Sequence, residues 1–267
     1  KTYEQILHEN ILNPLKMNNT GYDHHETILK NRASGYEKNE NKFQNADYLD
    51  MSVPYSAGAL YSTVEDLYLW DQALYNETLL PSKTRGLLFK PYIKAMGASY
   101  GYGWFVGKTP IGNTGDSVIV IGHPGGINGF NTSIQRIPSD KHLIVLLNNT
   151  GGAALIEMTT AIINILYNTS YAMPKRSIAF SLLDVINKNG LASGLEHFRK
   201  FKNSQNYSLK ENEMNSVGYN LLNSDKVTEA IEVFKLNVEA FPKSGNVYDS
   251  LAEAYLVNGN EKLATET

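Results

Sequence analysis

The sequence predicts an α+β domain, in which helices flank an antiparallel sheet, followed by an all-α tail. Short apolar runs joined by turn residues, typical of strands, lie within residues 99–148. Apolar residues at helical spacing precede and follow those runs. Beyond residue 176 the pattern is helical throughout and contains an internal repeat of 34 residues. We therefore expect two domains, residues 1–170 and 176–267.

The first helix is expected at the start of the chain. Thr2 and Gln5 form a capping-box pattern, and apolar residues share one face of a helix over residues 2–12. This helix is expected to stop near Pro14, because proline lacks a backbone N–H. Residues 18–57 are polar and carry loop signals such as NNTGY and SVPYSAG, so we expect them to be irregular.

The next helix is predicted within STVEDLYLWDQALY. Ser62 is its expected N-cap, because Glu65 follows three residues later and apolar residues then recur at helical spacing. The predicted helix covers residues 63–75, and a shorter one is expected near residues 82–89.

Four strand-like runs follow: YGYGWFVG, DSVIVIGH, FNTSIQRI and HLIVLLNN. Short turns between them, including PSDK at residues 138–141, imply antiparallel pairing. In the first run Tyr100, Tyr102 and Trp104 alternate, so we expect them on one face of a strand, as core or as pocket wall. The segment GGAALIEMTTAIINILYN returns to helical spacing and is expected to pack across the sheet.

The tail resembles the tetratricopeptide repeat in its period and in most signature positions. This resemblance implies helical hairpins, in which small residues allow close approach, and a peptide or protein partner. Residues 192–201 match the second helix of an earlier, degenerate unit. The repeated positions are Met214, Val217, Gly218, Leu221 and Ala230, and then Tyr248, Leu251, Ala252, Tyr255 and Ala264.

Composition excludes several classes of function. The formal net charge is −3 and no basic cluster contains interleaved aromatics, so no nucleic-acid partner is expected. The absence of cysteine excludes disulfides and thiolate catalysis. No stretch approaches the roughly 18 apolar residues of a transmembrane helix, and KTYEQILHEN lacks the apolar region of a signal peptide. Because the sequence starts within a helix and stops inside a repeat, we expect further residues in the natural protein.

Glycines are concentrated in IGHPGGINGFNTS, residues 121–133. A phosphate-binding loop is disfavoured, because such loops precede a helix, whereas this segment lies between two strand-like runs. Two interpretations stay open. One is a glycine-rich strand or bulge, and the other is a catalytic strand whose exposed amides bind a substrate.

Four segments favour the catalytic strand: PLKMNNTGY, SAGALYSTVEDLYLW, YGYGWF and GHPGGINGFNTSIQRIP. In this order and at these separations they resemble the C-terminal part of the serine β-lactamase and penicillin-binding-protein family, most closely its class C-like branch with D-alanyl peptidases and esterases. The resemblance covers about residues 1–167. It implies acyl transfer from a small-molecule or peptide substrate through a covalent seryl intermediate, without a cofactor. It also implies a place outside the cell or in its envelope, although zero cysteines fit a cytoplasmic protein equally.

Members of this family use an S-x-x-K motif, a Y-x-N motif and a third motif, K-T-G or H-x-G, which His123-Pro124-Gly125 matches here. The resemblance implies that His123 polarises the proton-transfer network and that Gly125 leaves room for substrate. The backbone N–H of Gly126 would donate to the oxyanion. The catalytic candidates are His123, Gly125 and Gly126, and the substrate-binding candidates are Pro124, Tyr102 and Asn128. The competing interpretation of His123 is an inert histidine at a strand end.

Two features depart from the family pattern. No lysine has a serine three residues before it and no Y-x-N occurs, so we expect this chain alone to be inactive. Pro124 cannot donate a hydrogen bond to a substrate carboxylate, which favours a peptidase or esterase over a β-lactam-specific enzyme. The alternative function, from another class, is a non-catalytic binding or scaffold module built from a hydrolase remnant and helical repeats.

Two further expectations concern metals and oligomers. His24, His25 and Glu26 invite comparison with a metal site, but adjacent histidines on a polar loop point in different directions and no third ligand is placed. No metal site is therefore expected. A sheet that lacks its first strands exposes an edge, and such an edge favours pairing with another copy of the chain.

Overall fold

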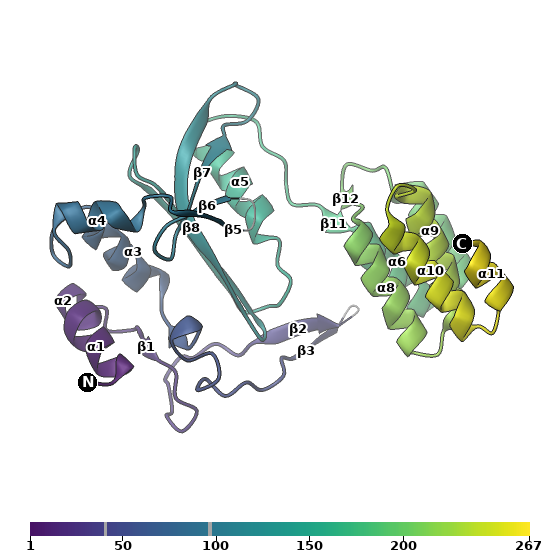
Figure 1. The fold of residues 1–267 in the computed structure, drawn as a ribbon, viewed down its shortest axis with the longest axis horizontal. Helices are drawn as coiled ribbons and strands as arrows, with labels where there is room; N and C mark the ends of the chain where they lie inside the picture. Colours follow the sequence, from purple (N-terminus) through teal and green to yellow (C-terminus); the bar gives the residue numbers. More distant parts are fainter. Residues whose placement is uncertain (40–41, 96–97) are drawn as a thin grey trace. The chain divides into compact units, whose positions relative to one another are not determined.

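The computed structural model describes residues 1–39, 42–95 and 98–267. The chain divides into two compact units, residues 1–174 and 175–267. The first holds an antiparallel sheet flanked by helices, and the second is built from helices (Figure 1). The predicted fold class is therefore confirmed. Within the described residues, no helix is long and apolar enough to cross a membrane.

The chain begins with one continuous helical stretch, made of α1 (Tyr3–Leu7), a π-helical turn (His8–Leu12) and α2 (Asn13–Leu15). The predicted capping box at its start is present. Pro14 lies in α2, and the stretch ends one residue after it, close to the predicted end. Its C-cap is Lys16, whose φ is 58°.

Residues 18–57 are more regular than predicted. They contain an antiparallel hairpin of β2 (Tyr36–Asn39) and β3 (Lys42–Asn45). They also contain β1 (Gly21–Tyr22), which pairs with β4 (Leu60–Tyr61), and a 3₁₀ turn at Tyr55–Ala57. Polar residues dominate these strands, so no alternating apolar pattern marks them.

Helix α3 (Val64–Ala73) and helix α4 (Ser82–Leu88) form where they were predicted. The N-cap of α3 is Thr63, whose hydroxyl accepts a hydrogen bond from the N–H of Asp66 at 3.2 Å. The prediction of Ser62 is wrong, because Ser62 hydrogen-bonds Thr20 instead, at 2.7 Å.

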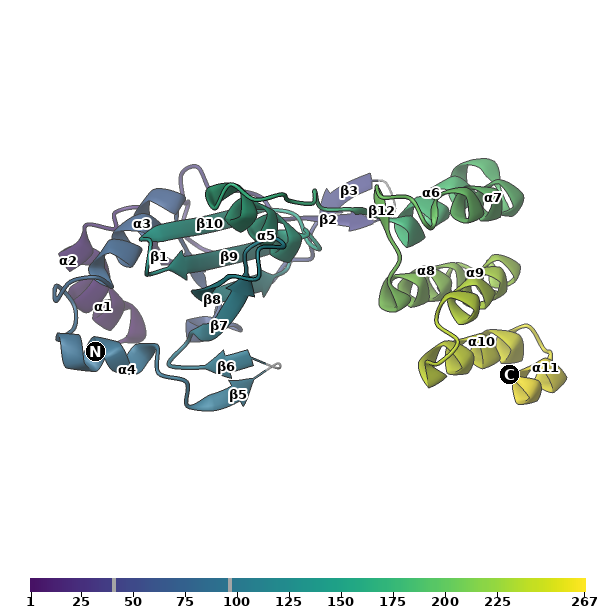
Figure 2. The same ribbon diagram turned by 90° about the horizontal axis from the view of Figure 1, so that it is seen from above.

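The sheet of the first unit has six antiparallel strands in the order β10-β9-β8-β7-β6-β5 (Figure 2). Their bounds are Ile93–Ala95 (β5), Ala98–Tyr100 (β6), Phe105–Pro110 (β7), Ser117–Ile127 (β8), Phe130–Ile137 (β9) and His142–Asn148 (β10). The described edge strands are thus β10 and β5. Pairing of an edge with another copy of the chain stays a prediction.

The run YGYGWFVG is not a single strand. Strand β6 ends at Tyr100, and the chain turns back before β7: the Gly101 N–H donates to the Trp104 carbonyl at 2.8 Å, and Gly103 has a φ of 75°. Trp104 enters the core, whereas Tyr102 is 63% exposed. The prediction that the three aromatic residues share one strand face is wrong, because glycines at alternate positions allow this turn.

Both faces of the sheet are covered. Val120 packs with Ile163 of α5 (Leu155–Leu166), while its neighbour Ile121 packs with Leu74 and Trp104 on the other face. Successive side chains of a strand point to opposite faces, so one strand serves two small cores. The prediction that α5 packs across the sheet is confirmed.

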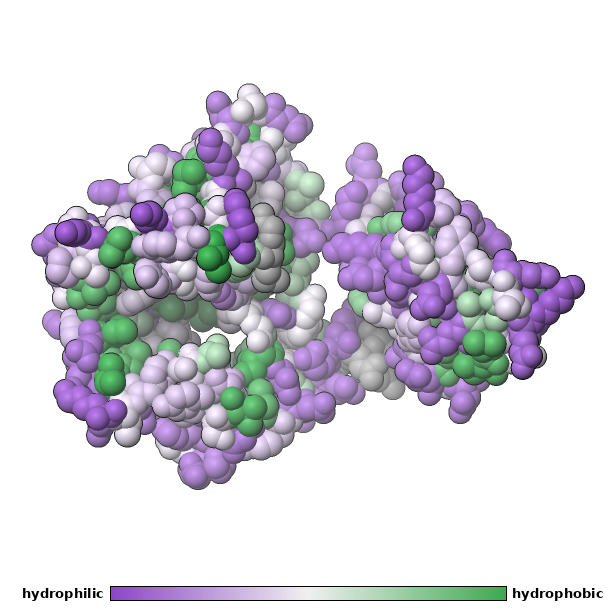
Figure 3. All heavy atoms as spheres, viewed as in Figure 1, coloured by the Kyte–Doolittle hydropathy of each residue, from purple (hydrophilic) through white to green (hydrophobic). Residues whose placement is uncertain are grey.

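The second unit contains three helix pairs, α6 with α7, α8 with α9 and α10 with α11. Their bounds are Ile178–Asn189 (α6), Leu191–Phe201 (α7), Glu211–Asn223 (α8), Val227–Ala240 (α9), Gly245–Val257 (α10) and Glu261–Glu266 (α11). A short parallel pair, β11 (Arg176–Ser177) and β12 (Tyr207–Ser208), accompanies them. One cluster of buried apolar side chains runs through the helices of this unit. On the surface of both units, hydrophobic residues form patches among hydrophilic ones (Figure 3).

The small residues of the repeat behave differently in its two copies. A Cβ atom on Gly218 would lie 2.4 Å from the Phe234 ring, so only glycine fits there without movement. At the equivalent position Ala252 is only partly buried, and Val247 and Ala254 fill the interior of that unit instead. The close approach predicted from the repeat is therefore present at the first copy.

We expect Gly218→Val to destabilise the helical unit by about 1–3 kcal/mol, because the added side chain overpacks the site against a fully buried ring. Urea unfolding followed by far-UV circular dichroism measures this change. Gly245→Ala is the control, since a Cβ atom there meets nothing within 4 Å. Equal stability of the two variants would contradict the packing described for Gly218.

Candidate active site

The glycine-rich segment lies at the end of β8. Strand β7 pairs with β8 only as far as Phe105 opposite Gly122, whereas β9 pairs with it up to Ile127. From His123 onward, β8 therefore has a neighbouring strand on only one of its two sides among the described residues, and that neighbour is β9. The exposed residues of this stretch are Pro124, Gly125 and Gly126. Placing the glycines between two strands was wrong for these positions, and only Gly129 lies in the turn.

His123 is held through both of its ring nitrogens. Nδ1 lies 2.5 Å from the carbonyl oxygen of Pro124, and Nε2 lies 3.0 Å from the hydroxyl of Tyr100. A carbonyl oxygen only accepts, so Nδ1 carries the proton in this geometry. In the neutral ring Nε2 is then unprotonated and accepts the hydrogen bond that the Tyr100 hydroxyl donates.

Three rings from three neighbouring strands surround this hydrogen bond. Tyr100 ends β6, Phe105 begins β7, and His123 lies in β8. The ring centres of Tyr100 and Phe105 are 4.7 Å apart, and those of Phe105 and His123 are 5.3 Å apart. The aromatic contacts fix the plane of the imidazole from one side. Phe105 was not predicted as part of the site, and Tyr100 was expected only as core or pocket wall, because β-strand register is not visible in a local pattern.

The glycines of this segment lie close to different neighbouring atoms, which a side chain at each position would meet. A Cβ atom on Gly122 would lie 2.5 Å from the backbone oxygen of Ile134, and one on Gly125 would lie 2.3 Å from the hydroxyl of Thr132. A Cβ atom on Gly126 would meet nothing closer than 3.6 Å. The missing side chain of Gly125 therefore makes room for β9. That Gly125 also leaves room for substrate stays a prediction.

The turn after β8 is anchored by a distant hairpin. Gly129, with a φ of 73°, donates its N–H to the carboxylate of Glu37 at 2.8 Å. The side-chain amide of Asn128 donates to the carbonyl of Asp47 at 3.1 Å. In this conformation Asn128 holds the chain after β3, and its role toward substrate stays a prediction. The sequence offered no signal for Glu37, which is 92 positions from Gly129.

Tyr102 lies apart from the ring cluster of His123. Its ring packs on that of Tyr92, with centres 5.1 Å apart, and its N–H donates to the carbonyl of Leu88 at 2.9 Å. Contact of Tyr102 with substrate therefore also stays a prediction. Four of the predicted residues, His123 through Gly126, are brought together simply because they are consecutive in β8.

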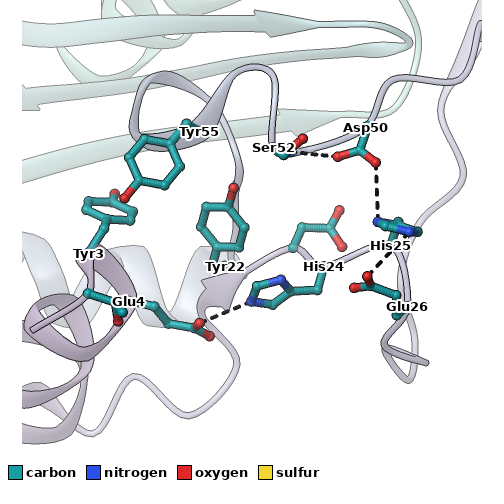
Figure 4. Close-up of a pocket in the computed structure, with 11 residues that line it drawn as sticks. Tyr3, Glu4, Tyr22, His24, His25, Glu26, Asp50, Ser52 and Tyr55 are labelled. Atoms are coloured by element: carbon teal, nitrogen blue, oxygen red, sulfur yellow. Dashed lines mark hydrogen bonds and ion pairs between the residues drawn. The ribbon is translucent and has the colours of Figure 1, made fainter.

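A separate cleft of about 470 Å³ lies near the start of the chain (Figure 4). Tyr3, Tyr22 and Tyr55 form one wall, with ring centres 5.3–6.2 Å apart. Desolvation, and secondarily Tyr55, raises the pKa of Tyr3. Hydrogen bonding by Ser52 lowers the pKa of Asp50 on the opposite side.

His24 and His25 also line this cleft and pair with carboxylates. Nε2 of His24 lies 3.1 Å from Glu4, and Nδ1 of His25 lies 3.3 Å from Asp50. Figure 4 shows the two imidazoles engaging different carboxylates. Within the described part of the chain, no three His, Asp or Glu side chains converge in a way that could hold a metal ion.

Comparison with known proteins relates this chain to a known family. A family model described as "Beta-lactamase" matches residues 1–166. The chain is 28% identical over 149 residues to PbpX of Bacillus subtilis, which carries the name of a penicillin-binding protein, and the match covers 55% of this chain and 34% of that protein. It is 26% identical over 123 residues to penicillin-binding protein 4* of the same organism, covering 45% of this chain and 26% of that protein. The chain thus spans about a third or less of the length of these curated relatives.

A solved structure shows the same fold. The octameric penicillin-binding protein homologue of Pyrococcus abyssi superimposes with a TM-score of 0.53 at 24% identity, covering 63% of this chain and 38% of that one. The family model extends over 166 of the 267 residues, and it includes β8 with its H-x-G sequence. The chain described here therefore belongs to the beta-lactamase family.

Proposed function

We propose that residues 1–166 supply one wall of a serine acyl-transfer site of the β-lactamase, D-alanyl peptidase or esterase type. The observation that carries the proposal is the free side of β8. Within the part of the chain that the structure describes, this strand has a neighbour on one side only from His123 to Ile127, and its middle residues are exposed. An extended acyl substrate can lie along such a strand and hydrogen-bond its backbone.

The residues of β8 have distinct proposed roles. A seryl oxygen attacks the substrate carbonyl, and negative charge develops on the carbonyl oxygen. The N–H of Gly126 donates to that oxygen, as one of two donors. His123, held through Nδ1 by the Pro124 carbonyl and through Nε2 by the Tyr100 hydroxyl, polarises the network that takes the seryl proton and returns it to the leaving group. Water then hydrolyses the acyl intermediate, or another nucleophile accepts the acyl group.

The nucleophile is proposed to lie outside these 267 residues, since the sequence holds neither S-x-x-K nor Y-x-N. The substrate class is proposed from Pro124, whose ring nitrogen has no proton and whose side chain offers no hydroxyl to a carboxylate. A small ester, which carries no such carboxylate, fits this wall better than a β-lactam does. From the similarity to penicillin-binding proteins, we also propose that the protein lies in the cell envelope.

We expect a fluorescent penicillin to label a longer natural protein carrying S-x-x-K and Y-x-N, and not the 267-residue chain. Turnover of p-nitrophenyl esters should show the same contrast, whereas turnover of a chromogenic cephalosporin by the longer protein should be weaker than its ester turnover. The matched control is the longer protein with the serine of S-x-x-K replaced by alanine. Covalent labelling of the 267-residue chain would contradict the proposed position of the nucleophile.

A second function, peptide binding by the helical unit as tetratricopeptide-type repeats, is favoured by a row of polar side chains. The Asn215 amide donates to the Ser250 hydroxyl at 3.0 Å, and the Tyr219 hydroxyl donates to Glu253 at 2.7 Å, so α8 and α10 share a polar face. This function needs no nucleophile. A longer gene without S-x-x-K would favour it over acyl transfer.

A further inference from the structure

The Tyr100 side chain contacts His123, the proposed proton-transfer residue, through its hydroxyl. Its oxygen lies 3.0 Å from Nε2 of His123, and the two ring centres are 5.8 Å apart. Both side chains are half-buried. The hydroxyl therefore has a defined partner in a partly dry environment, where a hydrogen bond is stronger than in water.

The second ring nitrogen sets the direction of that hydrogen bond. Nδ1 faces the carbonyl of Pro124, which can only accept, so the proton of neutral His123 belongs on Nδ1. Nε2 is then the acceptor, and the Tyr100 hydroxyl is the donor. The two hydrogen bonds support the same tautomer from opposite ends of the ring.

Register explains why Tyr100 reaches His123. Tyr100 lies opposite Phe105 across the β6–β7 pair, and Phe105 lies opposite Gly122 across the β7–β8 pair. His123 is the next residue along β8. The Phe105 ring, 4.7 Å from Tyr100 and 5.3 Å from His123 between centres, packs against both partners of the hydrogen bond.

We propose that Tyr100 is a positioning residue, which holds neutral His123 as the Nδ1–H tautomer with Nε2 unprotonated. The consequence for acyl transfer rests on the proposed function: the imidazole that polarises the proton-transfer network is kept in one tautomer and one orientation where the free side of β8 begins. Tyr100 acts through His123 and needs no contact with substrate.

The test is ¹⁵N NMR of the uniformly labelled 267-residue chain, read through long-range correlations within each imidazole. Loss of one set of signals in His123→Gln assigns His123 among the six histidines. We expect a protonated Nδ1 and an unprotonated Nε2. In Tyr100→Phe we expect the Nε2 signal to shift, as its hydrogen bond is lost, and the Nε2–H tautomer to become detectable.

Tyr92→Phe is the control, because Tyr92 also carries a hydroxyl on this part of the chain but its ring packs on Tyr102. It should leave the signals of His123 in place. Phe105→Leu removes a packed ring but no hydrogen bond. Comparing it with Tyr100→Phe therefore separates the effect of ring packing on the His123 signals from the effect of the hydrogen bond. An Nε2–H tautomer in the unmodified chain, or unchanged His123 signals in Tyr100→Phe, would overturn the proposal.

A rate measurement on the longer, nucleophile-bearing protein separates this proposal from the proposed function. Tyr100→Phe should slow acylation roughly ten-fold, and it should cost nothing further in a His123→Ala background, because residues that act through one another are not additive. Additive losses would overturn the positioning role. An unchanged rate in His123→Ala alone would refute the proposed function, while the tautomer measurement would still decide the role of Tyr100.

Discussion

Replacing Arg136 with methionine is expected to destabilise the N-terminal unit by about 3–5 kcal/mol, the largest stability effect that we predict. Arg136 is 1% exposed, and its Nε donates to the carboxylate of Asp71, which is 0% exposed. The guanidinium also lies 4.6 Å from the centre of the Tyr75 ring and 5.3 Å from that of Phe89. The variant leaves a carboxylate buried without its partner, and that cost exceeds any gain from an apolar side chain.

Urea unfolding followed by tryptophan fluorescence measures this effect, because both tryptophans, Trp70 and Trp104, belong to the N-terminal unit. The double variant Asp71→Leu with Arg136→Met removes both charges and should recover most of the loss. Lys1→Met is the control for an exposed ion pair, with Glu9, and should cost less than about 1 kcal/mol. Equal effects of the two single variants would contradict the buried pair.

His123→Ala in a longer, nucleophile-bearing protein is expected to lower the acylation rate roughly ten- to a thousand-fold, the scale of general acid–base effects. The reason is the loss of the imidazole that polarises proton transfer from the serine. Stopped-flow acylation by a p-nitrophenyl ester measures the rate.

His142→Ala is the matched control for this measurement, because His142 begins β10 and its ring packs on Tyr167. The control should retain the parent rate. If His123→Ala also retains it, His123 has no part in acyl transfer and its interpretation as an inert strand-end histidine is correct.

The meander of β8, β9 and β10 was predictable because apolar, β-branched runs alternate with a clear turn signal, PSDK. The β2–β3 hairpin was not, since its polar strands lack that alternation. The break after Tyr100 was missed for a different reason. Glycines between aromatic residues suit both an extended strand and a tight turn, and only packing of Trp104 in the core selects the turn.

The candidate site was predictable only where its residues are consecutive. The H-x-G segment predicts that His123 to Gly126 form one strand of the candidate site. Contacts with residues distant in the sequence support this segment: Tyr100 is 23 positions from His123, and Glu37 is 92 positions from Gly129. Such pairs depend on strand register and helix packing, which no local pattern encodes.

The central claim is that the free side of β8 receives an acyl group, and a crystal structure of the acylated longer protein tests it most directly. The account predicts an ester bond to a serine outside residues 1–267, with the acyl oxygen about 2.7–3.1 Å from the backbone nitrogen of Gly126. The acyl chain should run along His123 to Ile127. An acyl group attached elsewhere, with its oxygen beyond hydrogen-bond distance of Gly126, would contradict it.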